Sequence, residues 1–297
     1  MNYISHFVSL RCNSKLHLME VSPTTITHSE PVLMIHGMVE DGRIFYHHSG
    51  KGLASYLAKQ GFQVFVADLR GVGKSTPAIS SHSKHGQTET VCQDIPAIIQ
   101  FVKQHSSKQQ LHLVAHSWGG VYLNASLLRF PEIAKTIKSA VYFGSKRRIR
   151  VKNLARLFMI ELMWKRLGVL VSKTKGYFPA IALKAGSENE TKKTHLQCVD
   201  WITQDRWLDS DDGFDYHHAM KTSELPPILY FAAINDSCLG HRADVQLFAD
   251  ECYHDNAKYQ LLSKANGNQK DYGHLDMLTA KEAIDDHFPQ VVSWFTQ

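Results

Sequence analysis

Short apolar segments alternate with helical patterns along most of this chain, and this alternation restricts the fold more than any other feature. Apolar runs of strand length occupy residues 32–35, 64–67, 111–114, 137–143, 228–232 and 258–262. Helical spacing occupies residues 53–60, 88–104, 119–129, 242–251 and 281–294, and Pro289 must kink or divide the last of these. Strands that alternate with helices form parallel sheets. Residues 4–21 instead predict an antiparallel hairpin that turns at Asn13 and Ser14.

The alternation stops between residues 145 and 223, where no strand pattern is visible. This stretch is helical in pattern at first, then polar, then rich in Trp and Asp, and it is far longer than an ordinary connection. The chain has 297 residues, of which 43% are hydrophobic, and this is enough for one large core. The sequence therefore predicts an open α/β core from residues 1–144 and 224–297, with residues 145–223 inserted into it.

Ser117 lies in the strongest local motif, Ala115-His116-Ser117-Trp118-Gly119, between a predicted strand and a predicted helix. This is a G-x-S-x-G nucleophile elbow with alanine at its first small position. The residues two before and two after the serine must have a very small side chain or none, because the turn is very tight. The turn exposes Oγ beyond the sheet edge, and the helix N-terminus stabilises negative charge that develops there. The motif predicts Ser117 as a nucleophile.

This motif is accompanied by His36-Gly37-Met38, by the octet of residues 68–75 and by Gly273-His274-Leu275-Asp276. On these residues the chain resembles the α/β-hydrolase superfamily over nearly its whole length, and it looks like the esterases and the monoglyceride-lipase- or acid-lipase-like members. The resemblance implies a mostly parallel central sheet flanked by helices, with residues 145–223 as a helical cap over the nucleophile. It also implies a serine hydrolase that cleaves carboxylic esters and needs no cofactor or metal.

A serine nucleophile needs a base, and the base needs an acid that orients it. In the superfamily these residues follow one another along the chain as nucleophile, acid and histidine. Asp236 follows a predicted strand and His274 comes late in the chain, so the resemblance implies Asp236 as the acid and His274 as the base. Asp244 remains an alternative acid, and Asp276 is interpreted as the cap of the short helix after His274.

The resemblance places the oxyanion hole at two backbone N–H groups, those of Met38 and Trp118. Because only main-chain atoms are needed, we expect the side chains of Met38 and Trp118 to line the substrate pocket. His36 is expected to be structural. The octet 68–75 ends like a nucleotide-binding P-loop, but Asp68 stands where that motif requires its first glycine. We therefore expect a structural loop with no phosphate-binding role.

The net charge of +5 comes from one segment. Residues 146–175 hold ten Lys and Arg and a single acid, Glu161, for a net charge of +9, whereas the rest of the chain holds 23 basic and 27 acidic residues. Three interpretations remain open: a cap helix that packs its apolar face on the core with its cations in water, a membrane or lipid-interface patch, and attraction of an acidic substrate or partner. Nucleic acid is not expected, because no recognition motif accompanies the charge.

Other functions are kept as alternatives. A thioesterase or acyltransferase would use the same serine chemistry, and an aminopeptidase would need cap acids such as Asp211, Asp212 and Asp215 to bind a free amine. The cap aromatics Trp201, Trp207 and Phe214 are candidate pocket walls. From another class, the protein could be a non-catalytic binder on the same fold. Five scattered cysteines, no apolar stretch long enough to span a membrane and no signal-peptide pattern indicate a cytoplasmic protein with free thiols.

Overall fold

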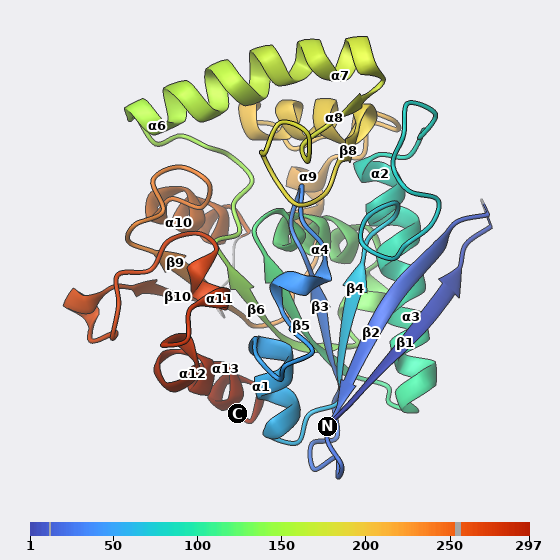
Figure 1. The fold of residues 1–297 in the computed structure, drawn as a ribbon, viewed down its shortest axis with the longest axis vertical. Helices are drawn as coiled ribbons and strands as arrows, with labels where there is room; N and C mark the ends of the chain where they lie inside the picture. Colours follow the sequence, from blue (N-terminus) through green and yellow to red (C-terminus); the bar gives the residue numbers. More distant parts are fainter. Residues whose placement is uncertain (12, 253–256) are drawn as a thin grey trace.

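The computed structural model describes residues 1–11, 13–252 and 257–297, so Cys12 lies outside the described residues. An eight-stranded sheet in the order β1-β2-β4-β3-β5-β6-β9-β10 forms its centre (Figure 1). β2 pairs antiparallel with both β1 and β4, and the other neighbouring strands pair parallel. This confirms the predicted, mostly parallel α/β sheet with an N-terminal hairpin.

The strands of this sheet are β1 (Asn2–Ser9), β2 (Lys15–Ser22), β3 (Val32–Ile35), β4 (Val64–Asp68), β5 (Leu111–His116), β6 (Ile137–Phe143), β9 (Ile228–Ala233) and β10 (Ala257–Leu262). The helices of the surrounding layers are α1 (Leu53–Lys59), α2 (Gln87–Glu89), α3 (Ile95–Ser106), α4 (Trp118–Arg129), α5 (Pro131–Ala134), α10 (Arg242–Glu251), α11 (Asp276–Thr279), α12 (Ala283–Asp286) and α13 (Phe288–Phe295). Shorter turns are η1 (Gly42–Ile44) and η4 (Lys264–Asn266), and the π-helical η2 (Thr90–Asp94) joins α2 to α3. Residues 145–223 carry α6 (Leu154–Arg156), the π-helical η3 (Leu157–Gly168), α7 (Val169–Lys175), α8 (Lys192–Thr203), α9 (Tyr216–Met220) and a two-stranded sheet of β7 (Tyr177–Phe178) and β8 (Glu190–Thr191).

Helices cover both faces of the sheet, which explains why its central strands are apolar on both sides. On one face, α3, α4 and α10 contribute buried residues such as Ile98, Leu127 and Phe248. On the other, α1 and α13 contribute Leu57 and Val291. The parallel strands therefore end together at one edge of a closed core, and the loops that follow them are free to carry function.

The predicted strands and long helices are present, with small differences at their ends. Pro289 divides the C-terminal segment as predicted, because α12 ends at Asp286 and Pro289 lies in the first turn of α13. No sequence pattern predicts β7 and β8, since two residues are too few to show a period. Asp276 does not cap α11: Leu275 holds the cap position, and the Asp276 carboxylate instead accepts the Gly273 N–H and pairs with Lys270.

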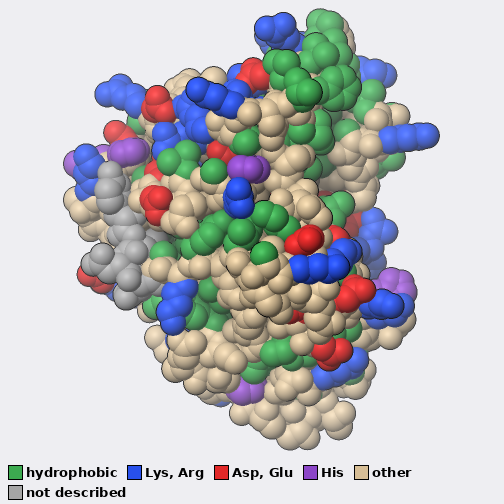
Figure 2. Space-filling view, turned by 90° about the vertical axis from the view of Figure 1, so that its left-hand side faces the viewer, with side chains coloured by type: hydrophobic (Ala, Val, Ile, Leu, Met, Phe, Trp, Pro, Cys, Tyr) green, Lys and Arg blue, Asp and Glu red, His purple; other side chains and the backbone are tan. Residues whose placement is uncertain are grey.

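Residues 154–175 form one long helical run, α6-η3-α7, across the top of the molecule with α8 beneath it (Figure 1). Many of its apolar side chains are exposed to solvent: Leu154, Leu157, Phe158, Met159, Leu162, Met163, Leu167 and Leu170. Figure 2 shows hydrophobic side chains gathered at the top of the molecule with basic side chains around them. The first of the three interpretations, a helix that packs its apolar face on the core, is therefore wrong for most of these residues. Within the described residues, no helix is both long and apolar enough to cross a membrane.

The expectation that the cations of this segment lie in water is wrong for Lys146 and Arg147, which are both buried. The Arg147 guanidinium forms an ion pair with Glu251 on α10 and donates to the carbonyl oxygens of Trp201, Gln204 and Asp205. It also lies 5.4 Å from the centre of the Trp207 ring. Arg147 thus joins the end of α8 to the core through one buried charge.

We predict that Arg147→Met lowers the free energy of unfolding by about 3–5 kcal/mol, because it removes the closest ion-pair partner of the buried Glu251 carboxylate. Urea unfolding followed by circular dichroism measures this. Arg150→Met is the matched control: the Arg150 side chain is 43% exposed, and its ion pair with Asp205 is worth less than about 1 kcal/mol. Equal stability of the two variants would contradict the role of Arg147.

Candidate active site

Ser117 lies between the last residue of β5 and the first residue of α4. Its φ of 49° and ψ of −120° are unfavourable for a residue with a side chain, and the neighbouring structure holds them in place. The Ser117 N–H donates to the Phe143 carbonyl oxygen at 2.8 Å. A side chain at position 119 would come within 2.5 Å of the Ile35 carbonyl oxygen, so Gly119 is required by close packing. The backbone is that of a nucleophile elbow.

His274 and Asp236 meet at the same edge of the sheet, 38 residues apart in sequence. His274 Nδ1 lies 2.5 Å from Asp236 Oδ2, and Asp236 Oδ1 accepts the N–H of Leu239 at 2.9 Å. Burial alone would raise the pKa of Asp236, but the hydrogen bond and charge of His274 hold that pKa below its usual range. Burial lowers the pKa of His274, which favours a neutral imidazole. Asp244 is held elsewhere, since its carboxylate accepts the Arg150 N–H at 2.7 Å.

The hydroxyl of Ser117 has an unexpected neighbour. Lys146 Nζ donates to Ser117 Oγ at 3.3 Å, and it lies 5.7 Å from the centre of the Trp118 ring. Among the described residues, Lys146 is the hydrogen-bond partner found for this hydroxyl, and the His274 ring makes no hydrogen bond to it. Catalytic hydrogen bonds are often long before substrate binds. The three residues predicted from sequence are therefore gathered together, with a buried lysine among them.

A second histidine, His116, stands behind the first. Its Nδ1 lies 2.6 Å from Glu40 Oε1 and its Nε2 lies 3.1 Å from the His274 carbonyl oxygen. A carbonyl oxygen only accepts, so Nε2 carries a proton, and the Glu40 carboxylate requires a proton on Nδ1 as well. Although burial opposes the charge of both residues, their attraction lowers the pKa of Glu40 and raises that of His116. The Glu40 carboxylate therefore favours the protonated form of His116, whose Nε2 donates to the main chain of His274.

Glu40 also holds the loop that follows β3. Its Oε1 accepts the Gly37 N–H at 2.5 Å, and a side chain at position 37 would come within 2.9 Å of Ser117 Cβ. This close approach brings the loop that contains Met38 beside the nucleophile. The Trp118 N–H is in the first turn of α4 and so has no carbonyl partner within the helix. The backbone donors expected from sequence therefore lie on the two segments that border Ser117, while the Trp118 side chain is buried and donates to Gln87.

Residues 186–190 of the insertion hold the same loop from above. The Val39 carbonyl oxygen accepts the N–H groups of Ser187 and Glu188 at 2.9 and 3.1 Å. Val39 has a φ of 56°, which is rare for a β-branched residue. Glu190 is buried beneath this contact, and burial raises its pKa to about 8. The loop is thus fixed between Glu40 on one side and the insertion on the other.

The other polar motifs singled out in the sequence have structural partners. His36 accepts the Leu69 N–H at 3.0 Å, as expected of a structural residue. Asp68 accepts the N–H groups of Gly42 and Lys74, both at 2.9 Å, and so organises its own octet. The acids considered for amine binding are occupied: Asp211 pairs with Lys193, Asp212 pairs with Arg129, and Asp215 caps α9. The cap aromatics pack against one another, and Trp201 and Trp207 are fully or almost fully buried.

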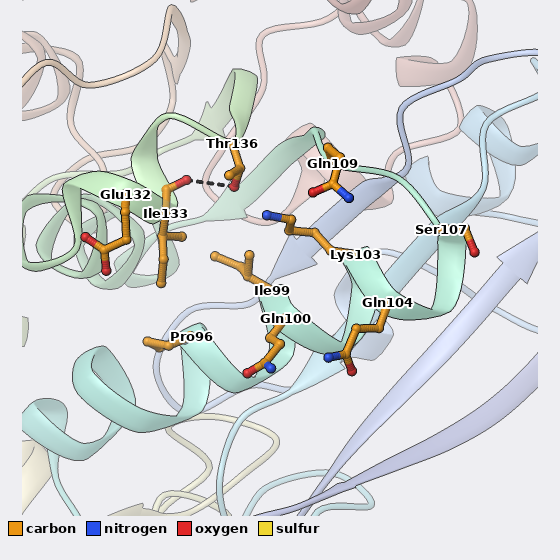
Figure 3. A pocket seen from close by; sticks show the side chains of 10 residues that line it. All are labelled: Pro96, Ile99, Gln100, Lys103, Gln104, Ser107, Gln109, Glu132, Ile133 and Thr136. Atoms are coloured by element: carbon orange, nitrogen blue, oxygen red, sulfur yellow. Dashed lines mark hydrogen bonds between the residues drawn. The ribbon is translucent and has the colours of Figure 1, made fainter.

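A large open hollow on the molecule lies away from Ser117. It has a volume of about 620 Å³, is lined mainly by α3 and the segment around α5, and is shown in Figure 3. Its residues Gln109 and Thr136 precede β5 and β6, whereas Ser117 follows β5. The hollow is therefore at the opposite end of the strands from the candidate active site.

His6, Glu20 and His105 form a cluster whose ligand atoms lie within 4.8 Å of one another. Glu20 Oε2 is 2.7 Å from His6 Nε2 and 3.2 Å from His105 Nε2, and Glu20 also accepts from Ser22 and Gln63. These hydrogen bonds account for the cluster as a link between the hairpin and α3. No metal was expected from sequence.

Sequence reasoning did not find Lys146, Glu40 or His116 as parts of the site. Lys146 was counted within a charged segment, and nothing in the pattern separates a buried lysine from its solvated neighbours. Glu40 follows the His36-Gly37 motif by a few residues, and His116 directly precedes the nucleophile. Their places beside known motifs are the signal that points to them, but their pairing depends on the tertiary fold.

Comparison with known proteins agrees with this architecture. The family model for the alpha/beta hydrolase fold matches residues 30–180, and the chain belongs to this family. A curated relative, "Putative lysosomal acid lipase/cholesteryl ester hydrolase" of Crotalus adamanteus, is 29% identical over 140 residues, which is 45% of this chain. The match spans about a third of that relative, 34% of its length.

Solved structures show the same fold across the whole chain. The esterase EaEST of Exiguobacterium antarcticum matches with a TM-score of 0.65 at 15% identity, covering 99% of this chain and 100% of that one. A thioesterase domain from the curacin biosynthetic pathway matches with a TM-score of 0.59 at 17% identity, with the same coverage. At these identities the likeness concerns the fold.

We predict that kcat/KM for ester hydrolysis falls as the pH is lowered, and that the midpoint of this fall lies below pH 6.5. Burial and the nearby His116 charge lower the pKa of His274, so the neutral base persists below its ordinary value of 6.5. Glu40→Gln removes the charge that keeps His116 protonated, so the midpoint in this variant moves to higher pH. Initial rates across a pH series measure both. A wild-type midpoint at or above 6.5, or a downward shift in Glu40→Gln, would show that another group sets the profile.

Proposed function

We propose that this protein hydrolyses carboxylic esters through an acyl-enzyme on Ser117. The observation that carries the proposal is the strained turn of Ser117 at the start of α4, with the His274–Asp236 hydrogen bond at the same sheet edge. The likeness to a lipase-like relative and to an esterase structure supports an ester substrate. We also propose residues 145–223 as a cap, since they join the core through Arg147 and hold the loop that contains Met38.

In the proposed mechanism, Ser117 Oγ attacks the ester carbonyl carbon while His274 Nε2 takes its proton. Asp236 keeps the imidazole in the tautomer with a proton on Nδ1 and stabilises its charged form. The N–H groups of Met38 and Trp118 donate to the oxyanion, each contributing on the order of 3 kcal/mol to the transition state. His274 then protonates the departing alcohol. Water, deprotonated by His274, attacks the acyl-enzyme and releases the acid and free Ser117.

The residues favour this function over two of the alternatives. An aminopeptidase needs free cap acids, whereas Asp211 and Asp212 are both paired with cations. A non-catalytic binder has no need for a buried, hydrogen-bonded pair such as His274–Asp236 beside a strained serine. A thioesterase or acyltransferase uses the same acyl-enzyme, so a substrate panel separates these from an esterase.

We predict that a fluorophosphonate probe labels the wild type and fails to label Ser117→Ala, because the probe needs an activated serine. Turnover of p-nitrophenyl acetate falls by at least about 10³-fold in His274→Ala, since the residues of a triad act as a unit. Ser49→Ala and His82→Ala, at exposed positions, serve as controls that keep wild-type labelling and turnover. Equal labelling of wild type and Ser117→Ala would refute the nucleophile. An acetyl thioester in parallel tests the alternative leaving group.

We further propose that the α6-η3-α7 helix contacts an anionic lipid surface. Leu154, Leu157 and Leu170 are 83, 60 and 59% exposed, and isolated soluble proteins rarely expose a contiguous apolar patch of this kind. Lys173 and Lys175 lie in the last turn of the same helix. An apolar face with basic side chains around it suits the headgroup region of an anionic bilayer.

The four described cysteines are free thiols, which supports our further proposal of a cytoplasmic location.

We predict that the wild type sediments with vesicles that contain phosphatidylglycerol and that added salt weakens this binding. The triple variant Leu157→Ser, Phe158→Ser, Leu170→Ser removes much of the exposed apolar area of this helix, so we expect it to stay in the supernatant. Ile26→Ser, which removes an apolar side chain that is 49% exposed away from this helix, sediments like the wild type. Equal sedimentation of wild type and triple variant, or a dimer that the triple variant dissociates, would count against a lipid partner.

A further inference from the structure

Lys146 is buried at the centre of the candidate active site, with an exposed fraction of 6%. It follows Gly144 and Ser145 after β6, and its ammonium is directed at the hydroxyl of Ser117. An ammonium has three N–H donors, and its one hydrogen bond found among the described residues is the 3.3 Å contact with Ser117 Oγ. No hydrogen bond from its other two donors is found within the described chain.

No carboxylate balances this charge at close range. Among the described residues, no Asp or Glu oxygen lies within 4.0 Å of Lys146 Nζ. Asp236 and Asp244 act on it from further away, and each is already hydrogen-bonded, to His274 and to the Arg150 N–H. Burial lowers the pKa of Lys146, because nothing nearby replaces the water that a free ammonium would bind.

The neighbouring cations show that this arrangement is specific to Lys146. Arg147, the next residue, is turned away to Glu251, and Arg148 pairs with Asp205. Buried charges in proteins are normally paired, because an unpaired one costs several kcal/mol. Lys146 is therefore a buried cation beside the nucleophile that lacks a charged partner. A negatively charged substrate would supply one.

We propose that Lys146 binds a carboxylate of the substrate, so that the preferred esters carry a negative charge close to the scissile bond. This inference rests on the proposed ester hydrolysis at Ser117. The bound carboxylate replaces Ser117 Oγ as the partner of the ammonium and leaves the hydroxyl free to turn to His274. Substrate binding and activation of the nucleophile are thereby linked.

Distance limits the size of the substrate. A charge-assisted hydrogen bond of about 2.8 Å to Nζ places the carboxylate within about 6 Å of Ser117 Oγ, given the 3.3 Å contact of the ammonium with that atom. About two or three methylene groups reach this far. A single ammonium matches the single charge of a carboxylate, whereas a phosphate dianion would need further donors, which Arg147 and Arg148 do not supply. Hemiesters of short dicarboxylic acids fit this description.

The test compares monomethyl succinate with dimethyl succinate, which differ by one charge at the far end. The specificity ratio is kcat/KM for the anionic ester divided by that for the neutral ester. We expect Lys146→Met to lower this ratio by about 30-fold or more, the loss that follows removal of one partner of a buried charge pair. Lys281→Met, at an exposed position on the connection between α11 and α12, leaves the ratio unchanged. Acetoxyacetate and its methyl ester repeat the comparison with the charge on the alcohol side.

A binding measurement separates this inference from the proposed function. Calorimetric titration of monomethyl succinate into Ser117→Ala is compared with the double variant Ser117→Ala, Lys146→Met, and we expect binding only when Lys146 is present. If the wild type cleaves no ester but this binding depends on Lys146, the proposed function fails and the carboxylate site stands. Equal losses for the anionic and neutral esters in both pairs, or binding that survives Lys146→Met, would overturn the carboxylate site. Equal losses would instead give Lys146 a role in the reaction itself.

Discussion

The conformation of Ser117 is the constraint on which the rest of the site depends. A residue with a side chain adopts φ 49° and ψ −120° only where the surrounding structure holds it there. Here the ladder of β5 ends in a hydrogen bond from Ser117 to Phe143, and α4 begins at the next residue against the main chain of β3. The sheet order that places β3 and β6 on either side of β5 is therefore a requirement of the turn. The packed core therefore fixes the turn at Ser117 and the position of its hydroxyl.

Charge is distributed around this turn in layers. Asp236 orients His274 from one side, and the Glu40–His116 pair holds the main chain of His274 and the Gly37 loop from behind. Lys146 adds a third charged group, beside the Ser117 hydroxyl. Asp236 and Glu40 each have a histidine as hydrogen-bond partner, whereas Lys146 has no carboxylate within 4.0 Å among the described residues. The carboxylates of the site thus have fixed partners, whereas the ammonium at the proposed carboxylate site has none of opposite charge.

Much of the fold was predictable because it depends on local periodicity. The parallel strands are short apolar runs. The nucleophile elbow can be recognised because the small residues Ala115 and Gly119 lie on either side of a serine between a strand and a helix. Asp236 and His274 were identified through resemblance and chain order, and the structure brings them within hydrogen-bonding distance. What sequence could not supply is which members of a run of cations are buried. Lys146, Arg147 and Arg148 are neighbouring cations in the sequence, yet Lys146 contacts the Ser117 hydroxyl. Arg147 and Arg148 instead both lie against Glu251, and Arg148 also pairs with Asp205. Sequence likewise could not decide among the three interpretations of the 154–175 helix, since periodicity shows an apolar face without showing what covers it.

The hydrogen bonds from Ser187 and Glu188 to Val39 have a consequence for how such a protein can vary. The segment proposed as a cap also holds the loop proposed to stabilise the oxyanion. An exchange of the insertion for that of a relative would therefore disturb the main chain at residue 39 as well as the pocket walls. Evolution or engineering of new specificity has more freedom in residues 154–175, which do not hold that loop, than in residues 186–190. In this chain, substitutions in residues 186–190 that change substrate choice would also disturb the loop proposed to stabilise the oxyanion.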